Sequence, residues 1–462
     1  MDRAYNTDRD TYRLIFTRRN ASEILLWSHG PAWALPFVEI AQGERIAEQL
    51  GAELYAQWGC RGYCLLIPTL VLGLQSYAVM EVTDLHEITP AGTCWKNLDA
   101  ATCSVMECAE DRKVIQQSIE ELDFYRREPR DGPFARPGWL PELCAWAQEQ
   151  VGPLGLRLTG AFTQLNASPE FSLIRLETTD SAVWFKATGP PNRHELPVTV
   201  CIARLFPGYV PELLGVHASW NGWLTREVPG RTLDHGTEFA SWRKVAGDLA
   251  QLQILSVGRQ AELLHGAHMD LRLPRLIEQV DPLIDRMRGL MAAQEKQTPA
   301  RLTDSELTLL GSCLKQACSL LSRLGLPDTL GHLDFNPGNI IISPERCVFL
   351  DWAEACLTNP VLTFEYLCEH FRRNCTKDRA AIRSLIAAYT RPWLALLSLD
   401  DLNQAAAFSP LVAVFAYAVA ADARRSSETC CNGFAGGYIR SLGRRMFREA
   451  EKMTYRSERC LA

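Results

Sequence analysis

The segment GHLDFNPGNIIISPERCVFLDW, residues 331–352, places two carboxylates and an amide around a predicted hairpin. Asp334 and Asn339 lie in a loop, a strand follows at 340–342, and a second strand ends at Asp351. Because a hairpin returns the chain to its start, we expect Asn339 and Asp351 to face each other. Their oxygens suit a hard divalent cation such as Mg²⁺. Asp334 would lie near that cation, where a carboxylate can accept the proton of an attacking hydroxyl.

Elements on both sides of this segment must position it. Strand patterns at 171–178 and 182–188 are joined by a turn, and a short helix and a second hairpin follow. From about residue 236 the pattern is helical, with helices predicted over 238–255, 273–295 and 305–325. A small strand-rich lobe ahead of a larger helical lobe predicts a ligand cleft between the two.

The region before these lobes predicts a separate small α/β domain. It has strand patterns at 12–19, 23–28, 62–67 and 76–82 and a helical pattern at 43–59. The stretch YRREPRDGPFARPGW, residues 125–139, carries three prolines and two glycines and predicts a linker. We therefore expect the parts 1–125, a linker at 126–140, a small lobe at 141–228 and a large lobe at 229–462.

Composition indicates a globular protein of the cytoplasm. The 462 residues are 47% hydrophobic and 22% charged, and the net charge of −6 comes without the basic stripe that nucleic acid requires. The N-terminus lacks a signal peptide, and the two most apolar runs are about half of the ~20 residues of a membrane span. We expect the sixteen cysteines to be reduced, and neither Cys60 with Cys64 nor Cys103 with Cys108 has zinc-site spacing.

The segment resembles the aminoglycoside phosphotransferase family of the protein-kinase-like superfamily. That family usually reads His-Gly-Asp-Leu-His-Pro-Gly-Asn with Asp-Trp downstream, and this chain reads HLDFNPGN from His332 with Asp351 and Trp352. The resemblance implies an α+β, two-lobed kinase-like fold that binds ATP or GTP with Mg²⁺. It makes Asp334 the catalytic base and makes Asn339 and Asp351 the metal ligands.

The same resemblance implies nucleotide-binding residues upstream. Lys186, in a strand of the small lobe, would hold the phosphates, and Glu195 would orient it, with Glu212 as the alternative. The backbone of Glu227–Val228 would meet the nucleotide base at the hinge. The phosphate-covering loop would be NASPEF, residues 166–171, which has no glycine. It can still offer its backbone amides and the hydroxyl of Ser168 to phosphate oxygens.

Several positions depart from the family pattern. Asn336 replaces the second loop histidine, Gln253 replaces a histidine after the first large-lobe helix, Asn359 replaces an aspartate, and Thr363 stands where an acid usually steadies the loop. These changes indicate a divergent branch, so the substrate does not follow from the family name. Three large-lobe acids are candidates for binding the amine of a cationic substrate: Glu354, Glu365 and Asp422.

The N-terminal region bears a fainter resemblance to Nudix hydrolases. The matching positions are Trp33, Leu35, Pro36, Gly43, Glu44, Glu53, Leu54 and Gly59. The metal-binding glutamates of that pattern are Ala56 and Gln57 here, and its arginine is Ala52. The resemblance therefore implies a Nudix-like scaffold without hydrolase activity. The alternative is an unrelated α/β domain, because Ile46, Leu50 and Leu54 at helical spacing are explained by core packing alone.

Three hypotheses follow for the whole chain. The first is a small-molecule kinase that transfers the γ-phosphoryl group of ATP or GTP to the hydroxyl of a small acceptor, for which a cationic molecule is one candidate. The second is a catalytically silent kinase-like nucleotide-binding or regulatory protein, favoured by the glycine-free loop and disfavoured by the intact Asp, Asn and Asp set. The third is a bifunctional chain whose first domain still binds nucleotides.

Overall fold

A computed structural model of the chain describes residues 9–18, 23–29, 32–42, 45–68, 76–82, 92–97, 102, 106, 108–127, 132–234, 236–266, 269–426 and 433–461. The chain divides into two compact units. Unit 1 comprises the residues up to Leu196 together with Leu213–Glu227, and unit 2 comprises Pro197–Glu212 and the residues from Val228 onward. The passage from unit 1 to unit 2 after Glu227 falls at the predicted hinge.

Unit 1 contains two sheets and three helices among its described residues. The first sheet has the order β3-β2-β1-β6-β5, with β4 paired to β1 and β7 paired to β2. Its elements, with the helices that follow them, are β1 (Arg9–Arg18), β2 (Glu23–His29), β3 (Ala32–Ala34), β4 (Phe37–Ala41), α1 (Ile46–Trp58), β5 (Gly62–Leu66), β6 (Ser76–Val82), β7 (Thr93–Asn97), α3 (Ala109–Arg127) and α4 (Trp139–Val151).

Both faces of β1 in the first sheet are covered. Neighbouring residues of this strand point to opposite sides and pack into different clusters. Leu14 and Phe16 pack with Leu50 and Leu54 of α1, whereas Ile15 belongs to a second cluster that includes residues of α3 and α4. The strands and the helix predicted in this region are all present. Gly43 and Glu44 lie outside the described residues, and the Nudix resemblance stays a prediction.

The second sheet of unit 1 is antiparallel, with the order β11-β12-β10-β9-β8. Its strands are β8 (Leu158–Ala167), β9 (Phe171–Thr178), β10 (Val183–Thr188), β11 (Leu213–His217) and β12 (Gly222–Arg226). Residues of β9 alternate between buried and partly exposed positions, as a sheet covered on one face requires. The strand β8 has no counterpart in the sequence-based prediction.

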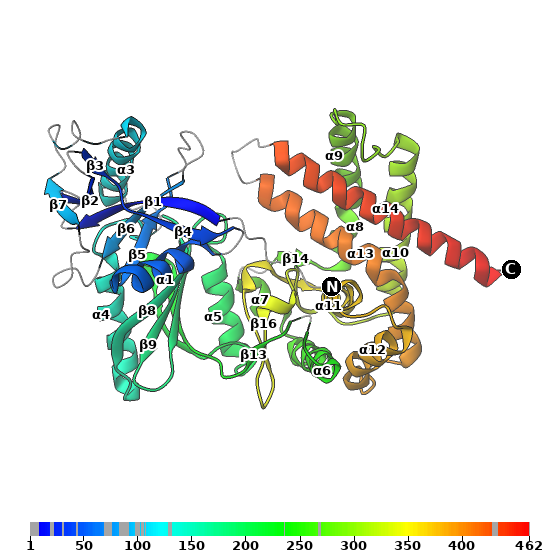
Figure 1. Cartoon of the computed structure of the whole chain (residues 1–462). Helices are drawn as coiled ribbons and strands as arrows, with labels where there is room; N and C mark the ends of the chain where they lie inside the picture. The colour runs from blue at the N-terminus through cyan, green and yellow to red at the C-terminus, as the bar shows by residue number, and fades with distance from the viewer. Residues whose placement is uncertain are drawn as a thin grey trace. The chain divides into compact units, whose positions relative to one another are not determined.

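The two sheets of unit 1 share one core. Tyr63 of the first sheet stacks edge-on against Trp139 of α4, which contacts Phe134, and Phe134 contacts Phe185 of the second sheet. Gln164 of β8 joins the backbones as well, since its side-chain amide accepts from Cys64 N at 2.7 Å and donates to Cys64 O at 2.9 Å. In Figure 1, α1 lies beside β8. The N-terminal region and the predicted small lobe therefore form one packed body.

Unit 2 is mainly helical and contains two small sheets. After α5 (Glu195–Leu205), in which the chain passes from unit 1 to unit 2, its described elements are β13 (Arg231–Thr232), α6 (Phe239–Ser256), α7 (Gln260–His265), β14 (Met269–Leu271), α8 (Leu273–Glu278), α9 (Val280–Ala292), α10 (Asp304–Arg323), β15 (Thr329–His332), β16 (Ile340–Ile342), β17 (Cys347–Phe349), β18 (Ala355–Thr358), α11 (Pro360–Asn374), α12 (Arg379–Trp393), α13 (Leu399–Ser426) and α14 (Gly433–Leu461). The sheets have the orders β13-β16-β17 and β14-β18-β15.

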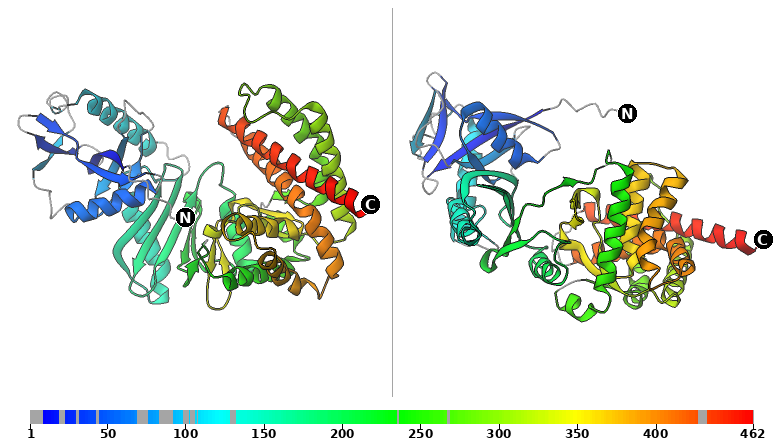
Figure 2. Two further views of the ribbon diagram at one scale, coloured as in Figure 1. Left: turned by 45° about the vertical axis from the view of Figure 1, so that its right-hand side comes forward. Right: turned by 90° about the horizontal axis from the view of Figure 1, so that it is seen from below.

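Two local features explain the helix boundaries of unit 2. Thr303 and Glu306 form a reciprocal capping box that begins α10. The region predicted as one helix over 273–295 is instead α8 and α9, interrupted at Gln279. Pro282 lies at the third position of α9 and has no N–H to donate to a preceding carbonyl, so the proline favours a break here. Figure 2 shows the orange α13 and red α14 side by side, and both also contact α10.

The helix α13 combines length with apolar composition. Within the described residues, Leu399–Arg424 is the one stretch long and apolar enough to cross a membrane, and 61% of its most apolar window is buried inside the protein. The apolar run Leu411–Ala421, which by itself is too short to span a bilayer, is thus part of a longer helix. Because a buried core helix meets the same criteria, this composition is weak support for a span.

Candidate functional site

The loop after β15 holds Asp334 by short-range hydrogen bonds. Asn336 donates from Nδ2 to Asp334 Oδ1 at 2.9 Å, and its own Oδ1 accepts from Gly338 N at 2.8 Å. Asn339 donates from Nδ2 to Asp334 O at 3.0 Å and to Asp334 Oδ2 at 3.2 Å. Both carboxylate oxygens are therefore oriented by side-chain amides, and each retains a lone pair for a further hydrogen bond.

The predicted hairpin brings Asp351 next to Asn339. β16 and β17 pair antiparallel with Ile340 opposite Phe349, and Leu350 N donates to Asn339 O at 2.8 Å. Asp351 itself is exposed and has a left-handed backbone, with φ 60° and ψ 64°. A non-glycine residue in this region of the backbone map is strained, and such strain concentrates at functional sites. The hairpin thus places an exposed carboxylate beside the Asp334 loop.

His332 connects the loop to the end of the hairpin. Its ring Nε2 lies 3.0 Å from Leu350 O, and its ring packs against Trp352 at a centroid distance of 4.8 Å. Its backbone N–H donates to Thr363 Oγ1 at 3.0 Å, and both residues are fully buried. Thr363, where the family usually has an acid, thus holds the start of the loop with a neutral hydroxyl. Glu365, two residues later, instead pairs with an arginine.

A third carboxylate, Glu354, lies close to the loop. Burial raises the pKa of Glu354, the positive charge of Arg424 opposes this rise, and the negative charges of Asp334 and Asp351 add to it. Arg424 Nη2 lies 3.0 Å from Glu354 Oε1, whereas Glu354 Oε2 is buried and has no hydrogen-bond partner among the described residues. The sequence offered Glu354 as a site for an amine, but Arg424 already pairs with one oxygen of this carboxylate.

In unit 1, Lys186 and Glu195 form an ion pair. Lys186 of β10 donates from Nζ to Glu195 Oε1 at 2.5 Å, and Glu195, at the start of α5, is 2% exposed. The rings of Phe171 and Trp223 lie within 5.9 Å and 5.8 Å of Nζ. Glu212, the alternative partner, is exposed and belongs to unit 2. A lysine fixed by a buried carboxylate has the geometry needed to hold phosphate oxygens.

The remaining predicted nucleotide residues lie at a turn and at the hinge. Ser168 occupies the short turn between β8 and β9, where its Oγ accepts from Glu170 N at 3.2 Å. Glu227 N donates to Ala182 O at 3.0 Å, and the side-chain bonds of Arg175 hold the pKa of Glu227 below its usual value. Val228 is the first residue of unit 2 after the hinge. The roles of these residues in nucleotide binding stay predictions.

Two other departures from the family pattern are structural. Gln253 is fully buried in unit 2, where it donates to Pro360 O at 3.0 Å and accepts from Tyr389 Oη at 2.7 Å. Asn359 begins α11 by accepting from Val361 N at 3.3 Å. Both residues therefore anchor helices near the loop rather than face solvent.

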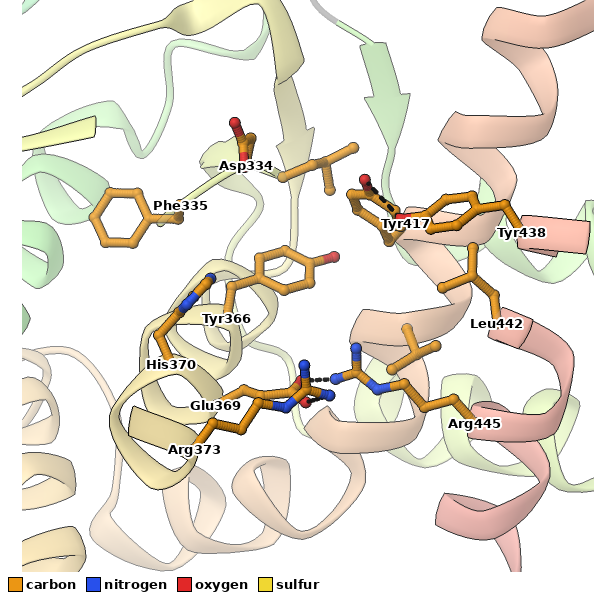
Figure 3. Close-up of a pocket in the computed structure, with 12 residues that line it drawn as sticks. Asp334, Phe335, Tyr366, Glu369, His370, Arg373, Tyr417, Tyr438, Leu442 and Arg445 are labelled. Carbon is orange, nitrogen blue, oxygen red and sulfur yellow. Dashed lines mark hydrogen bonds and ion pairs between the residues drawn. The ribbon is translucent and has the colours of Figure 1, made fainter. Parts of the chain in front are cut away.

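A pocket of about 180 Å³ opens beside the Asp334 loop, entirely within unit 2. Its lining residues are Leu333, Asp334, Phe335, Tyr366, Glu369, His370, Arg373, Val414, Tyr417, Tyr438, Leu442 and Arg445. Figure 3 shows Asp334 at one end of this pocket and the cluster of Glu369, Arg373 and Arg445 at the other, with the Tyr366 ring between them. The sequence pointed to none of these residues except Asp334. The one sequence signal for an ion pair among these residues was the spacing of Glu369 and Arg373, which are four residues apart on α11.

The Asp334 loop lies in a part of the sequence that matches a known family model. Residues 192–397 match the model described as the phosphotransferase enzyme family, whose members transfer phosphoryl groups to hydroxyls. This segment contains Asp334, Asn339 and Asp351. It begins after Lys186, so the match does not include the predicted phosphate-binding lysine. A comparison with curated proteins found no match.

Solved structures of small-molecule kinases resemble the chain at low identity. Choline kinase from Streptococcus pneumoniae is 15% identical, covers 66% of this chain and 99% of its own, and has a TM-score of 0.44. An ethanolamine kinase from Plasmodium vivax is 15% identical, covers 66% of this chain and 88% of its own, and has a TM-score of 0.46. The GDP and kanamycin complex of APH(2")-IIia is 15% identical, covers 67% and 98%, and has a TM-score of 0.42. The match to the phosphotransferase family model is confined to residues 192–397.

Proposed function

We propose that the protein is a small-molecule kinase that transfers the γ-phosphoryl group of ATP or GTP to a hydroxyl of its acceptor. The observation that carries this proposal is the arrangement of Asp334, Asn339 and Asp351 around one loop and one hairpin. Asp334 accepts the proton of the acceptor hydroxyl as its oxygen forms a bond to the γ-phosphorus. The bond from that phosphorus to the bridging oxygen breaks, and a nucleoside diphosphate leaves.

The residues of the hairpin fit a magnesium ion. The Nδ2 atom of Asn339 is directed at Asp334, so its Oδ1 is turned to the other side of the amide. Asp351 adds an exposed carboxylate. No group of three or more His, Cys, Asp or Glu side chains suited to a metal occurs among the described residues, but Mg²⁺ needs only one or two such protein ligands when phosphates complete its shell. Bound there, it would neutralise phosphate charge.

The ion pair of unit 1 supports the same proposal. Lys186 would position the nucleotide phosphates while Glu195 keeps its ammonium in place. The glycine-free turn is the feature that favours the silent alternative, because Ser168 Oγ already binds the N–H of Glu170. The backbone N–H of Glu170 is then engaged within the turn and does not point at a phosphate. The exposed Glu170 carboxylate would in addition repel a phosphate.

Magnesium-dependent thermal shifts with ATP, GTP and no nucleotide test this proposal. A nucleotide at about 100 times its Kd stabilises the native state by about 2.7 kcal/mol, which is about 5–10 °C for a domain of this size. Asp351→Asn is the sharpest variant, since asparagine tolerates the left-handed backbone and removes only the charge. The exposed Asp400→Asn is the matched control.

The outcomes separate the two hypotheses. A kinase requires a shift that depends on magnesium, is lost in Asp351→Asn and persists in Asp400→Asn, together with slow release of phosphate from the nucleotide when no acceptor is present. Binding without any such turnover favours the silent protein. Absence of a shift with both nucleotides refutes the proposed function.

A further inference from the structure

The pocket beside Asp334 carries an unusual balance of charge for a site that takes amines. Among its lining residues the carboxylates are Asp334 and Glu369, and the guanidinium groups are Arg373 and Arg445. Arg373 and Arg445 each bind one oxygen of Glu369. Among the lining residues at the end of the pocket away from Asp334, two guanidiniums therefore face one carboxylate.

The two arginines differ in how firmly they are held. Arg445, on α14, has a side chain that is 28% exposed, while Arg373, on α11, is 61% exposed. Burial lowers the pKa of Arg445, and the nearby groups Glu449, Tyr366 and Glu365 oppose this shift. A second anion at this place would stabilise that charge. An ammonium group would instead have to displace one of the arginines and remain beside the other.

The walls between the two ends offer aromatic surface and hydroxyls. Tyr366 Oη donates to Ala413 O at 2.7 Å, and Tyr438 Oη donates to Tyr417 Oη at 3.1 Å. Phe335 and the side chains of leucine and valine complete the lining. An apolar or aromatic ligand body would cover these groups.

The acids that the sequence suggested for binding an amine are not among the residues that line the pocket. Each is paired with an arginine: Glu354 with Arg424, Glu365 with Arg372 and Asp422 with Arg286. A polycationic acceptor would therefore meet no uncommitted carboxylate in this lining other than Asp334, which the proposed function uses as the base.

We propose that the acceptor of this kinase carries an anionic group, such as a carboxylate or a phosphate, which binds Arg445 and Arg373 while its hydroxyl reaches Asp334. This inference rests on the proposed function. It replaces the expected cationic acceptor with a molecule that has an anionic end, an apolar or aromatic body and a hydroxyl at the other end. Arg445 determines specificity, because it is the less exposed of the two guanidiniums.

Three probes with one skeleton test the charge preference on the full chain. They are 4-(hydroxymethyl)benzoate, 1,4-benzenedimethanol and 4-(hydroxymethyl)benzylamine, which differ only in whether the group opposite the hydroxymethyl is anionic, neutral or cationic. Binding is measured by calorimetry and thermal shift without nucleotide, and phosphoryl transfer is measured with magnesium and nucleotide. We expect the benzoate to bind and react best and the benzylamine worst.

Two variants give opposite expected results. Arg445→Gln removes a charge-assisted hydrogen bond and weakens benzoate binding about ten- to hundredfold. Glu369→Gln frees both guanidiniums from their carboxylate and strengthens benzoate binding. The control is Arg323→Gln, at the end of α10, which is exposed and outside the pocket lining and leaves the preference unchanged.

Each outcome decides the inference separately from the proposed function. Preferred binding of the benzylamine, lost in Glu369→Gln, overturns the inference and makes Glu369 an amine site. Equal binding of the three probes, or binding of none, also overturns it. A protein that binds the benzoate as expected but shows no nucleotide shift keeps the anion site and loses the kinase function.

Discussion

Replacing Thr363 by valine tests whether its hydroxyl holds the start of the Asp334 loop. Thr363 Oγ1 accepts the backbone N–H of His332 at 3.0 Å, and the two residues are 0% and 1% exposed. Valine keeps the shape of threonine but leaves this buried N–H without an acceptor, which costs about 1–3 kcal/mol. For a domain of this size the melting temperature should fall by about 2–10 °C.

The assay compares Thr363→Val with Thr390→Val by thermal and urea denaturation. Thr390 is also buried in unit 2, at 6% exposure, but its Oγ1 makes only a long bond of 3.4 Å to Ala387 O within its own helix. We expect this control to lose less stability than Thr363→Val, because its hydroxyl is a donor in one long bond and no buried backbone N–H depends on it. Because His332 also touches Leu350 O, Thr363→Val should reduce nucleotide turnover as well. Equal stability of the two variants would refute the role given to Thr363.

Three further predictions concern buried polar groups. Burial raises the pKa of Glu354 above its ordinary 4.5, so the folded state binds the carboxyl proton more tightly than the unfolded state. The stability that this proton contributes is lost as pH rises from 4.5 through the folded pKa. Glu354→Gln should therefore reduce the fall of the denaturation midpoint over this pH range. Tyr389→Phe removes the hydroxyl bonded to Gln253 and should cost about 1 kcal/mol in urea denaturation, and an unchanged midpoint would contradict it. Gln164→Leu strips both partners from the Cys64 backbone and should speed hydrogen exchange of the Cys64 amide, whereas unchanged exchange would show that water or another group replaces the bonds.

Periodicity predicted much of the secondary structure because the relevant signals are local. The alternating residues of β9 and the helical spacing of α10 reflect one buried face each, and both elements are present. The strand β8 gave no such signal. It contains Gly160, with φ 84°, and its ladder with β9 is irregular at two places, so its residues do not alternate cleanly.

The candidate site divides in the same way. Asp334, Asn339 and Asp351 are close in sequence, so a loop and a hairpin were sufficient to predict that they lie together. Thr363 and Arg445 reach the site from distant helices. Their contacts depend on how α11 and α14 pack, which no local pattern reveals. The charge preference inferred for the pocket was therefore out of reach of the sequence, which favoured a cationic acceptor.

The shared core of unit 1 limits how this protein can be recombined. The aromatic contacts from Tyr63 through Trp139 and Phe134 to Phe185 cross from the N-terminal sheet to the second sheet of unit 1, which carries Lys186. A chimera that kept only one of these sheets would expose fully buried rings on each side of the cut. An exchange of the sheet that carries Lys186 with a sheet from another protein thus has to carry the N-terminal sheet with it, and the smallest portable module is the whole of unit 1.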